Sequence, residues 1–326
     1  MKYVFYSLLL LVMASCREEP MEAQPVQEIV RLEQTSYATY LNREVKLIHL
    51  SLHEEGLPVR HVEVRAMQHQ DNARGAFILT QGGFGNKFYG ISFEKHTTLN
   101  HAFNQGLEVF EIRWMAEQGW ASGVEGIGYP RAVRVYKEIV KWLKKHEMIN
   151  PSLIISHGGS GGSFQIAYGL THFGLEEEVD YAILAAGPPT ADLELAIFGD
   201  PAHPAYWPSG IGGFAFTDII HGWRGEGDYC VRRNRQPPGF VLDTLDKSSL
   251  LSKTEDRDYA YTTHLYFVNS NDETHADEQG RLFYEKVEST KEWHYLPDET
   301  SHDVTGFPAG AQKVREIIRT ILRNKY

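Results

Sequence analysis

Ser160 is the residue of this chain whose surroundings most clearly indicate chemistry. It stands at the centre of a Gly-x-Ser-x-Gly pattern within residues 156–163, which read Ser-His-Gly-Gly-Ser-Gly-Gly-Ser. An apolar run, 153–155, precedes this stretch, and a helix-compatible segment, 164–171, follows it. At a sharp turn from strand to helix, a serine hydroxyl projects above the sheet and can attack a substrate. The context therefore predicts a nucleophile elbow, and not a flexible glycine linker.

The small residues around Ser160 fit this prediction. Gly158 and Gly162 stand two positions to either side, where a side chain would collide with the turn. Gly161 begins the expected helix, so its backbone N–H points to where an oxyanion would form. Ser163 has glycine two positions before it but not two positions after it. Ser160 is therefore the better candidate.

A serine hydroxyl is a poor nucleophile unless a base takes its proton and a carboxylate orients that base. Two later segments supply such groups. The predicted strand 264–269 is followed by Asp272, and the predicted strand 293–296 is followed by His302. Because parallel strands end at the same edge of a sheet, we expect both side chains to lie near Ser160.

The chain order Ser160, Asp272, His302, with each residue at the end of a strand, resembles the α/β-hydrolase superfamily across about residues 45–326. The resemblance implies that His302 is the general base and then the general acid. It also implies that Asp272 accepts the imidazole N–H and stabilises the imidazolium. The implied fold has a mostly parallel central sheet with helices on both faces.

Other residues compete for the acid and base roles. Asp277 is the next acid candidate, although it more naturally caps its helix. Asp192 follows the preceding strand, a position that some members of the superfamily use. His294 lies within a predicted strand, where packing or a hydrogen bond explains it. His157 is too near the serine in sequence to reach over the elbow, so we expect a structural hydrogen bond from it.

A second oxyanion donor is expected after another strand. Residues 81–85 read Gln-Gly-Gly-Phe-Gly and follow the predicted strand 76–80 directly. This loop resembles the His-Gly-Gly-Gly type of the superfamily, with glutamine replacing histidine, and it implies a donor amide at Gly83 or Phe84. The alternative is a tight turn, which glycine pairs commonly form.

The expected elements bring these residues to one edge of a sheet. Besides the strand before Ser160, strands are predicted at 44–52, 59–67, 76–80, 107–112, 181–186, 264–269 and 293–296. Helices are predicted at 93–104, 130–145, 277–287 and 308–323. The first two strands should form an antiparallel hairpin. The later alternation of strands and helices predicts a mostly parallel sheet covered on both faces.

Residues 187–262 interrupt this alternation and carry several prolines, glycines and aromatic residues. Their length exceeds that of ordinary connections, which favours a functional lid insertion above the sheet edge. Trp207 and Trp223 lie in the insertion, while Trp114 and Trp120 follow the fourth predicted strand. We expect their rings to shape a pocket for an acyl, aryl or sugar group.

The N-terminus predicts export. Residues 1–15 contain a lysine, an apolar stretch too short to span a bilayer, and small residues directly before Cys16. This pattern resembles the lipobox of bacterial lipoproteins and implies that Cys16 carries the lipid anchor. A plain secretory signal beside a cysteine is the alternative. Residues 16–29 are then a tether and 30–326 the hydrolase domain. The implied location is the cell envelope, on the outer membrane facing the periplasm or the cell surface.

Composition excludes several function classes. The chain has 326 residues and a formal net charge of -11, which argues against binding nucleic acid through its phosphates. Apart from Cys16, Cys230 is the only cysteine, so neither an intramolecular disulfide nor a cysteine-based metal site can form. We expect Cys230 to be a packed, idle thiol.

The sequence thus predicts a serine hydrolase of the cell envelope that cleaves a carboxylic ester through an acyl-serine intermediate. No metal, nucleotide or redox cofactor is implied, and the expected substrate is a small-molecule or glycan-linked ester. Two alternatives stay open. One is a serine peptidase of the same fold, and the other is a non-catalytic lipoprotein that binds a glycan or a partner.

Overall fold

A computed structural model of the chain describes residues 29–326 apart from 203–204, 206–211, 226, 233–236 and 273. The predicted signal peptide, the lipidation site Cys16 and nearly all of the tether lie outside the described residues. The strands are β1 (Val30–Tyr40), β2 (Arg43–Leu52), β3 (Arg60–Met67), β4 (Gly75–Thr80), β5 (Leu107–Trp114), β6 (Ile154–Gly159), β7 (Tyr181–Ala185), β8 (His264–Ser270) and β9 (Lys291–Leu296). The helices are α2 (Phe93–Asn104), α3 (Tyr129–Val133), α4 (Val135–His146), α5 (Gly161–Phe173), α6 (Leu193–Phe198), α7 (Gly212–Ile220), α8 (Gly239–Ser248), α9 (Ala276–Lys286) and α10 (Pro308–Lys325). Short 3₁₀ turns occur at Gly119–Ala121, Leu175–Glu177 and Val304–Gly306.

The strands form a single sheet in the order β1-β2-β3-β5-β4-β6-β7-β8-β9. The pairs β1–β2, β2–β3 and β3–β5 are antiparallel, and every pair from β5 to β9 is parallel. Both the predicted hairpin of β2 and β3 and the predicted mostly parallel sheet are therefore confirmed. The carboxyl ends of β4, β6, β8 and β9 meet at one edge, which is where the candidate residues follow their strands.

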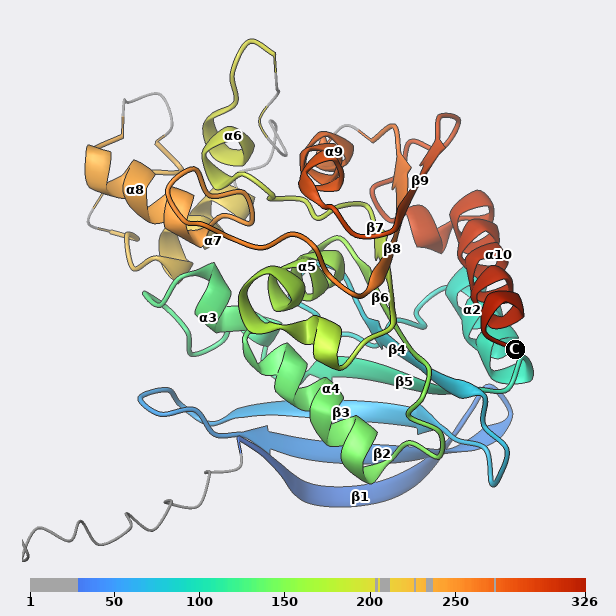
Figure 1. The fold of residues 1–326 in the computed structure, drawn as a ribbon. Coiled ribbons are helices and arrows are strands. Elements are labelled where there is room, and N and C mark those ends of the chain that lie inside the picture. The colour runs from blue at the N-terminus through green and yellow to red at the C-terminus, as the bar shows by residue number, and fades with distance from the viewer. Residues whose placement is uncertain (1–28, 203–204, 206–211, 226, 233–236, 273) are drawn as a thin grey trace, which may run out of the picture.

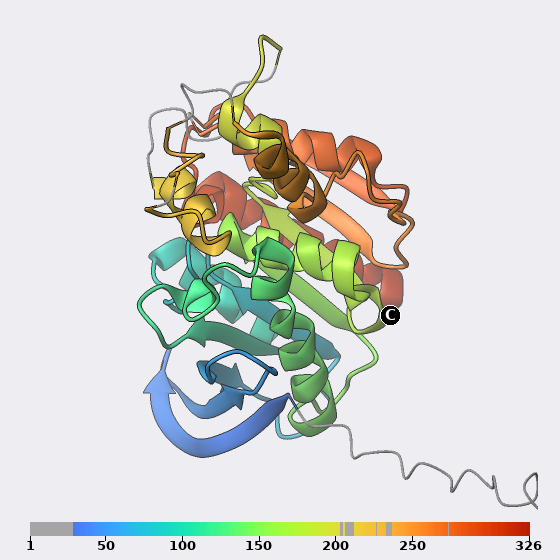
Figure 2. The ribbon, with the colours of Figure 1, turned by 90° about the vertical axis from the view of Figure 1, so that its left-hand side faces the viewer.

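The edge strand β1 was absent from the elements predicted above. Its side chains are mostly exposed, including those of Leu32 and Tyr37, and its register shifts between Leu32 and Gln34. An exposed edge strand has no buried face to impose a regular alternation of apolar and polar residues. Figure 2 shows β1 as the strongly curved blue strand at the margin of the sheet.

Helices cover both faces of the sheet, as predicted (Figure 1). On one face, α4 and α5 pack over a cluster that includes Ile48, Val64 and Ile139. On the opposite face, α2 and α10 lie side by side over a second cluster that includes Leu99 and Ile318. The sheet is thus buried between two apolar layers, which makes it a rigid support for loops at its edge.

The helix predicted at 130–145 is instead two helices, α3 and α4, that are interrupted at Arg134. The backbone of Arg134 keeps right-handed helical angles (φ -47°, ψ -43°), so the chain continues in nearly the same direction. The apolar face was predicted correctly, since Tyr136, Ile139 and Leu143 are all fully buried. Periodicity reports which face is buried but not whether each hydrogen bond of the helix forms.

Between β7 and β8, the described part of 187–262 contains α6, α7 and α8 and no strand, as expected. Figure 1 shows these three helices gathered beyond one end of the sheet. None of the helices within the described ranges of 29–326 combines the length and apolarity that crossing a membrane requires.

Candidate active site

The turn that carries Ser160 joins β6 to α5, as the motif predicted. Ser160 has φ 50° and ψ -114°, a backbone conformation that costs about 1–3 kcal/mol for a residue with a side chain. Its N–H donates to Ala185 O at 2.8 Å, and its C=O accepts from Phe164 N at 2.9 Å. The Ser163 hydroxyl also donates to this C=O, at 2.6 Å. These contacts hold the strained turn, and they give the rival serine a supporting position.

The glycines around Ser160 are required by close packing. A Cβ on Gly158 would lie 2.3 Å from Gly162 C, and one on Gly162 would lie 2.5 Å from Thr80 O. A Cβ on Gly161 would lie 2.1 Å from Gly83 O. Since real Cβ atoms do not approach other atoms within 3.0 Å, the elbow and the loop after β4 touch through bare backbone.

The structure brings His302 and Asp272 together with Ser160. The Nε2 atom of His302 lies 2.7 Å from Ser160 Oγ, and its Nδ1 atom lies 3.4 Å from Asp272 Oδ2. The hydroxyl of Thr274, which the sequence analysis missed, lies 3.1 Å from His302 Nδ1 and donates to Asp272 Oδ1. Thr274 N–H also donates to Asp272 Oδ1, at 2.7 Å. The predicted order of three residues therefore corresponds to a continuous chain of contacts.

Electrostatics favour an ionised acid in this chain of contacts. Burial alone would raise the pKa of Asp272, but hydrogen bonds from His302 and Thr274 outweigh it and hold the pKa below its usual value. An ionised Asp272 keeps a proton on His302 Nδ1. The Nε2 lone pair then faces the Ser160 hydroxyl and can accept its proton, which is what general-base catalysis needs.

Hydrogen bonds to its carbonyl groups hold the glycine loop after β4 in place. Trp120 donates from Nε1 to Gly83 O at 3.1 Å and from its backbone to Phe84 O at 3.0 Å, while Trp114 N donates to Gly85 O at 2.8 Å. Within the described residues, the amides of Gly83 and Phe84 have no protein acceptor. The first amide of α5 likewise has no acceptor inside its helix. These three amides are therefore available to an oxyanion.

A buried lysine links the glycine loop to the loop of the histidine. Lys95, only 1% exposed, places its Nζ 2.8 Å from the carboxylate of Asp303 and 3.2 Å from Gln81 Oε1. Burial lowers the pKa of Lys95, and the contact with Asp303 opposes that shift. Because Asp303 follows His302 directly and Gln81 opens the glycine loop, Lys95 fixes the two loops relative to each other. No sequence motif identified Lys95 as a functional residue.

The rival acids occupy other positions. Asp192 caps α6 by accepting from Leu195 N at 3.0 Å, and it faces Lys253 Nζ at 3.9 Å. Asp277 was expected to cap α9, but the cap position belongs to His275 and Asp277 lies in the first turn. A carboxylate there is favoured by the positive end of the helix dipole, which explains its place without a cap.

The rival histidines have structural partners. His157 is buried, with Nδ1 3.0 Å from Ile183 O and Nε2 3.1 Å from the hydroxyl of Tyr89. Burial lowers its pKa to about 4, so it is neutral near pH 7. The structural role expected for it fits these contacts. His294 lies on β9, with its Nε2 3.5 Å from Glu292.

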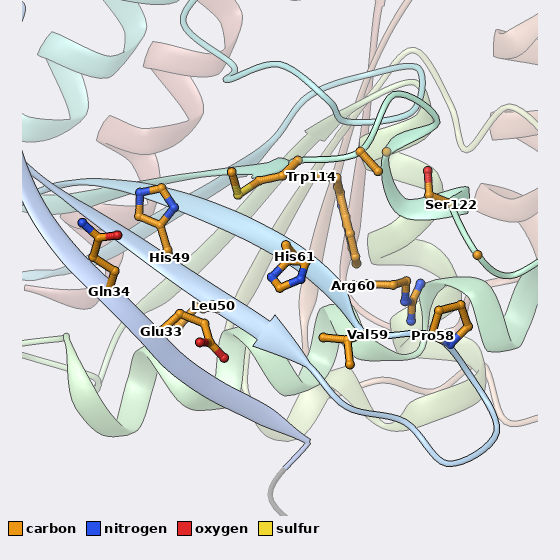
Figure 3. Close-up of a pocket in the computed structure, with 14 residues that line it drawn as sticks. Glu33, Gln34, His49, Leu50, Pro58, Val59, Arg60, His61, Trp114 and Ser122 are labelled. Atoms are coloured by element: carbon orange, nitrogen blue, oxygen red, sulfur yellow. The ribbon is translucent and has the colours of Figure 1, made fainter.

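The four tryptophans singled out in the sequence lie in different places. Trp120 lines a cavity of about 350 Å³ beside Ser160. Trp114 instead borders a separate hollow of about 650 Å³ against β1–β3, shown in Figure 3, which neither Ser160 nor His302 lines. Trp223 stacks on a neighbouring histidine ring at 4.7 Å and lines neither cavity described beside the serine. Trp207 lies outside the described residues.

Other chemistries find less support in the described part of the chain. It contains no group of three His, Cys, Asp or Glu side chains arranged to hold a metal ion. Cys230 is buried, and burial together with Asp218 raises the pKa of its thiol, which keeps it protonated. A protonated buried thiol is not a nucleophile, in agreement with the expected idle role.

The fold and the geometry of the elbow are those of the α/β-hydrolase fold, and comparison with solved structures agrees. The acetyl xylan esterase from Paenibacillus sp. R4 superposes with a TM-score of 0.54 at 14% identity, covering 89% of each chain. Alpha/beta hydrolase domain-containing protein 10 from mouse gives 0.52 at 10% identity, over 90% of this chain and 100% of that chain. The carboxylesterase EstE1, from a metagenomic library, gives 0.51 at 17% identity over 90% of each chain. At these identities the likeness defines the fold alone. No protein-family model and no curated protein sequence matches the chain.

Proposed function

We propose that this protein is a serine hydrolase that cleaves carboxylic esters through an acyl-serine intermediate on Ser160. The observation that carries the proposal is the 2.7 Å contact between His302 Nε2 and Ser160 Oγ at the strained elbow. Several neighbours in fold are esterases by name, which agrees with this reaction class.

The contacts of Ser160 and His302 support the following acylation step. Ser160 Oγ attacks the ester carbonyl carbon while His302 Nε2 takes the hydroxyl proton. The carbonyl oxygen becomes an oxyanion, which the amides of Gly161 and of Gly83 or Phe84 stabilise. His302 then gives the proton to the departing alcohol oxygen, the carbon–oxygen bond breaks, and the acyl group stays on the serine.

Deacylation repeats the same chemistry with water. Water replaces the alcohol, His302 removes its proton, and the oxygen attacks the acyl-serine carbonyl. The second tetrahedral intermediate collapses to the free acid, and the proton returns to Ser160. Asp272 stabilises the imidazolium in both steps, and Thr274 holds that carboxylate in place.

Two other functions compete with ester hydrolysis. A peptidase would use the same residues, and assays of aminoacyl amides beside acyl esters would distinguish it. A non-catalytic glycan-binding or partner-binding protein would have no need for a nucleophile, a base and an acid in contact. Failure to react with any ester or with a fluorophosphonate would favour that alternative.

The direct test is the Ser160→Ala variant. We expect it to lose hydrolysis of p-nitrophenyl acetate and covalent labelling by a fluorophosphonate, while its thermal unfolding stays close to that of the wild type. Undiminished turnover in this variant would refute the proposal.

We also propose a lipid anchor at Cys16 that attaches the protein to the outer membrane of the cell envelope. The sequence pattern of residues 1–16 supports this location. Metabolic labelling with an alkyne-tagged palmitate should mark the wild type and not Cys16→Ser. Equal labelling of both proteins would eliminate the anchor.

A further inference from the structure

Ser160 stands between two cavities of different character. The first, here called the aromatic cavity, has a volume of about 350 Å³ and lies between Ser160 and helices α6 and α7. The second, the polar cavity, has about 460 Å³ and is lined by His302 and the residues that follow it. Ser160, Gly83 and Phe84 line both, so a carbonyl group at the serine can extend a substituent into each cavity.

Six aromatic rings line the aromatic cavity: Phe84, Trp120, Tyr129, Phe164, Phe214 and Phe216. The rings support one another. Trp120 stacks on Phe164 with centroids 5.4 Å apart and meets Phe216 edge-on at 5.4 Å. Phe84 lies 5.0 Å from Phe216. Among the described residues that line this cavity, none carries a charge. A charged group placed here would lose its hydration without compensation, whereas a flat ring would find faces and edges to pack against.

The polar cavity differs in that charged and polar side chains share its wall with apolar ones. Its lining includes Gln81, Asn86, Lys87 and Asp303 together with Phe84, Ile91 and Val304. Asn86 and Lys87 are exposed, and the carboxylate side chain of Asp303 is 50% exposed. Solvent-exposed donors and acceptors therefore border this cavity, where they can hydrogen-bond the hydroxyls of a polar alcohol.

The position of His302 decides which part of an ester enters which cavity. During acylation, His302 Nε2 must deliver its proton to the oxygen of the departing alcohol. The alcohol therefore has to lie on the His302 side, which is the polar cavity. The acyl substituent lies on the other side of the carbonyl carbon and enters the aromatic cavity, which His302 does not line.

We infer that the substrate joins an aromatic carboxylic acid to a hydrophilic, polyhydroxylated alcohol such as a sugar. The inference rests on the proposed ester hydrolysis and adds the identity of its two products by chemical class. The reaction breaks the bond between the acyl carbon and the alcohol oxygen, releases the polyol from the polar cavity, and leaves the aromatic acyl group on Ser160 for water to remove.

Four esters test the assignment on the wild-type protein. They are 6-O-(3-phenylpropanoyl)glucose, 6-O-acetylglucose, hexyl 3-phenylpropanoate, and the reversed ester 2-phenylethyl gluconate. We expect kcat/KM for the first to exceed that for acetylglucose at least about 100-fold, because a filled apolar pocket discriminates by about 10–200-fold for even one methylene. The reversed ester should be a poor substrate. Equal or better turnover of acetylglucose, of the hexyl ester or of the reversed ester would overturn the inference.

Two matched variants add the same side chain to each cavity. Ala196 lines the aromatic cavity and Ile91 the polar one. Ala196→Phe should lower the preference for phenylpropanoyl over acetyl esters of glucose by about 10-fold or more. Ile91→Phe should instead lower the preference for the glucose ester over the methyl ester of 3-phenylpropanoate. Thermal unfolding and fluorophosphonate labelling verify that each variant is folded and has a reactive serine. If Ala196→Phe leaves the acyl preference unaltered in a folded protein, the aromatic cavity does not hold the acyl group.

The same measurements separate this inference from the proposed function. A protein that labels with fluorophosphonate and cleaves esters, but prefers acetyl or alkyl groups, keeps the hydrolase function and loses the substrate assignment. A protein that neither labels nor cleaves any of the four esters loses both.

Discussion

Gly161→Ala offers a sharp test of the oxyanion site, because it adds one methyl group next to the serine without changing any polar side chain. In an exposed helix this exchange is favourable by about 1 kcal/mol, since alanine is the better helix former. Here the new Cβ would lie 2.1 Å from Gly83 O. The variant therefore sets a small gain in helix propensity against a direct steric conflict with the glycine loop.

The extent of the steric overlap at Gly83 O sets the expected loss of kcat. Contacts closer than 3.0 Å are not tolerated, so α5 and the glycine loop must separate by roughly 1 Å at Gly83. Donors to an oxyanion act at about 2.7–3.1 Å, and loss of one donor lowers kcat by about 100- to 1000-fold. We expect a loss of this size for ester hydrolysis.

Gly159→Ala is the matched control, because the same change on the other side of Ser160 meets no atom within 4 Å. The assay is steady-state hydrolysis of p-nitrophenyl acetate by both variants, together with the rate of fluorophosphonate labelling.

The reasoning is wrong if Gly161→Ala retains kcat within about threefold of the wild type while remaining folded, since a donor loss costs about 100-fold or more. In that case the amides of the elbow and of the glycine loop do not hold the oxyanion. Because Gly159 lines the polar cavity, an equal loss of activity in Gly159→Ala would indicate that any methyl group beside the serine hinders the substrate.

Three further predictions concern residues outside the expected triad. Lys95→Met removes the cation that joins the glycine loop to Asp303. Because the Asp303 carboxylate is half-exposed, we expect the free energy of unfolding to fall by about 1–3 kcal/mol and kcat to fall about 10-fold. Unchanged values in both assays would contradict the linking role. Thr274→Val removes a hydroxyl that donates to Asp272, and we expect kcat to fall about 10-fold with little change in KM. Thr274→Ser keeps the hydroxyl and should restore kcat. If kcat stays low in Thr274→Ser, the threonine acts through packing. The pKa of His157 is about 4 in the folded protein and near 6.5 in the unfolded chain. Between these pH values the unfolded chain binds more protons than the folded protein. The free energy of unfolding therefore falls by about 3 kcal/mol as the pH drops from about 6.5 to 4. Urea unfolding of the wild type and His157→Gln at pH 7 and pH 5 measures this loss, and an equal decline in both proteins would exclude His157 as its source.

The sequence predicted those features that depend on local patterns. The elbow of Ser160 needs glycines at fixed spacings, and the acid and the histidine each need a strand directly before them, so all three could be found from residue order. The mostly parallel sheet followed from the alternation of strands and helices.

Features that depend on contacts between distant segments could not be predicted in this way. Lys95 contacts Gln81, 14 residues before it in the chain, and Asp303, 208 residues after it, and nothing in the sequence around Lys95 distinguishes it from a solvated helix residue. Thr274 is one of many threonines until the turn after β8 places it against an acid. The edge strand β1 is exposed and irregular, so the pattern that identifies buried strands is missing there.

The origins of the cavity walls suggest how specificity could change within this fold. The side chains proposed to carry the chemistry follow β6, β8 and β9, whereas Ala196, Ile197, Phe214 and Phe216 come from the segment that leaves β7 and returns at β8. Replacing that segment would remodel the acyl site and leave the reaction centre in place. Recombination there is thus a direct route to new specificities, both in evolution and in the laboratory.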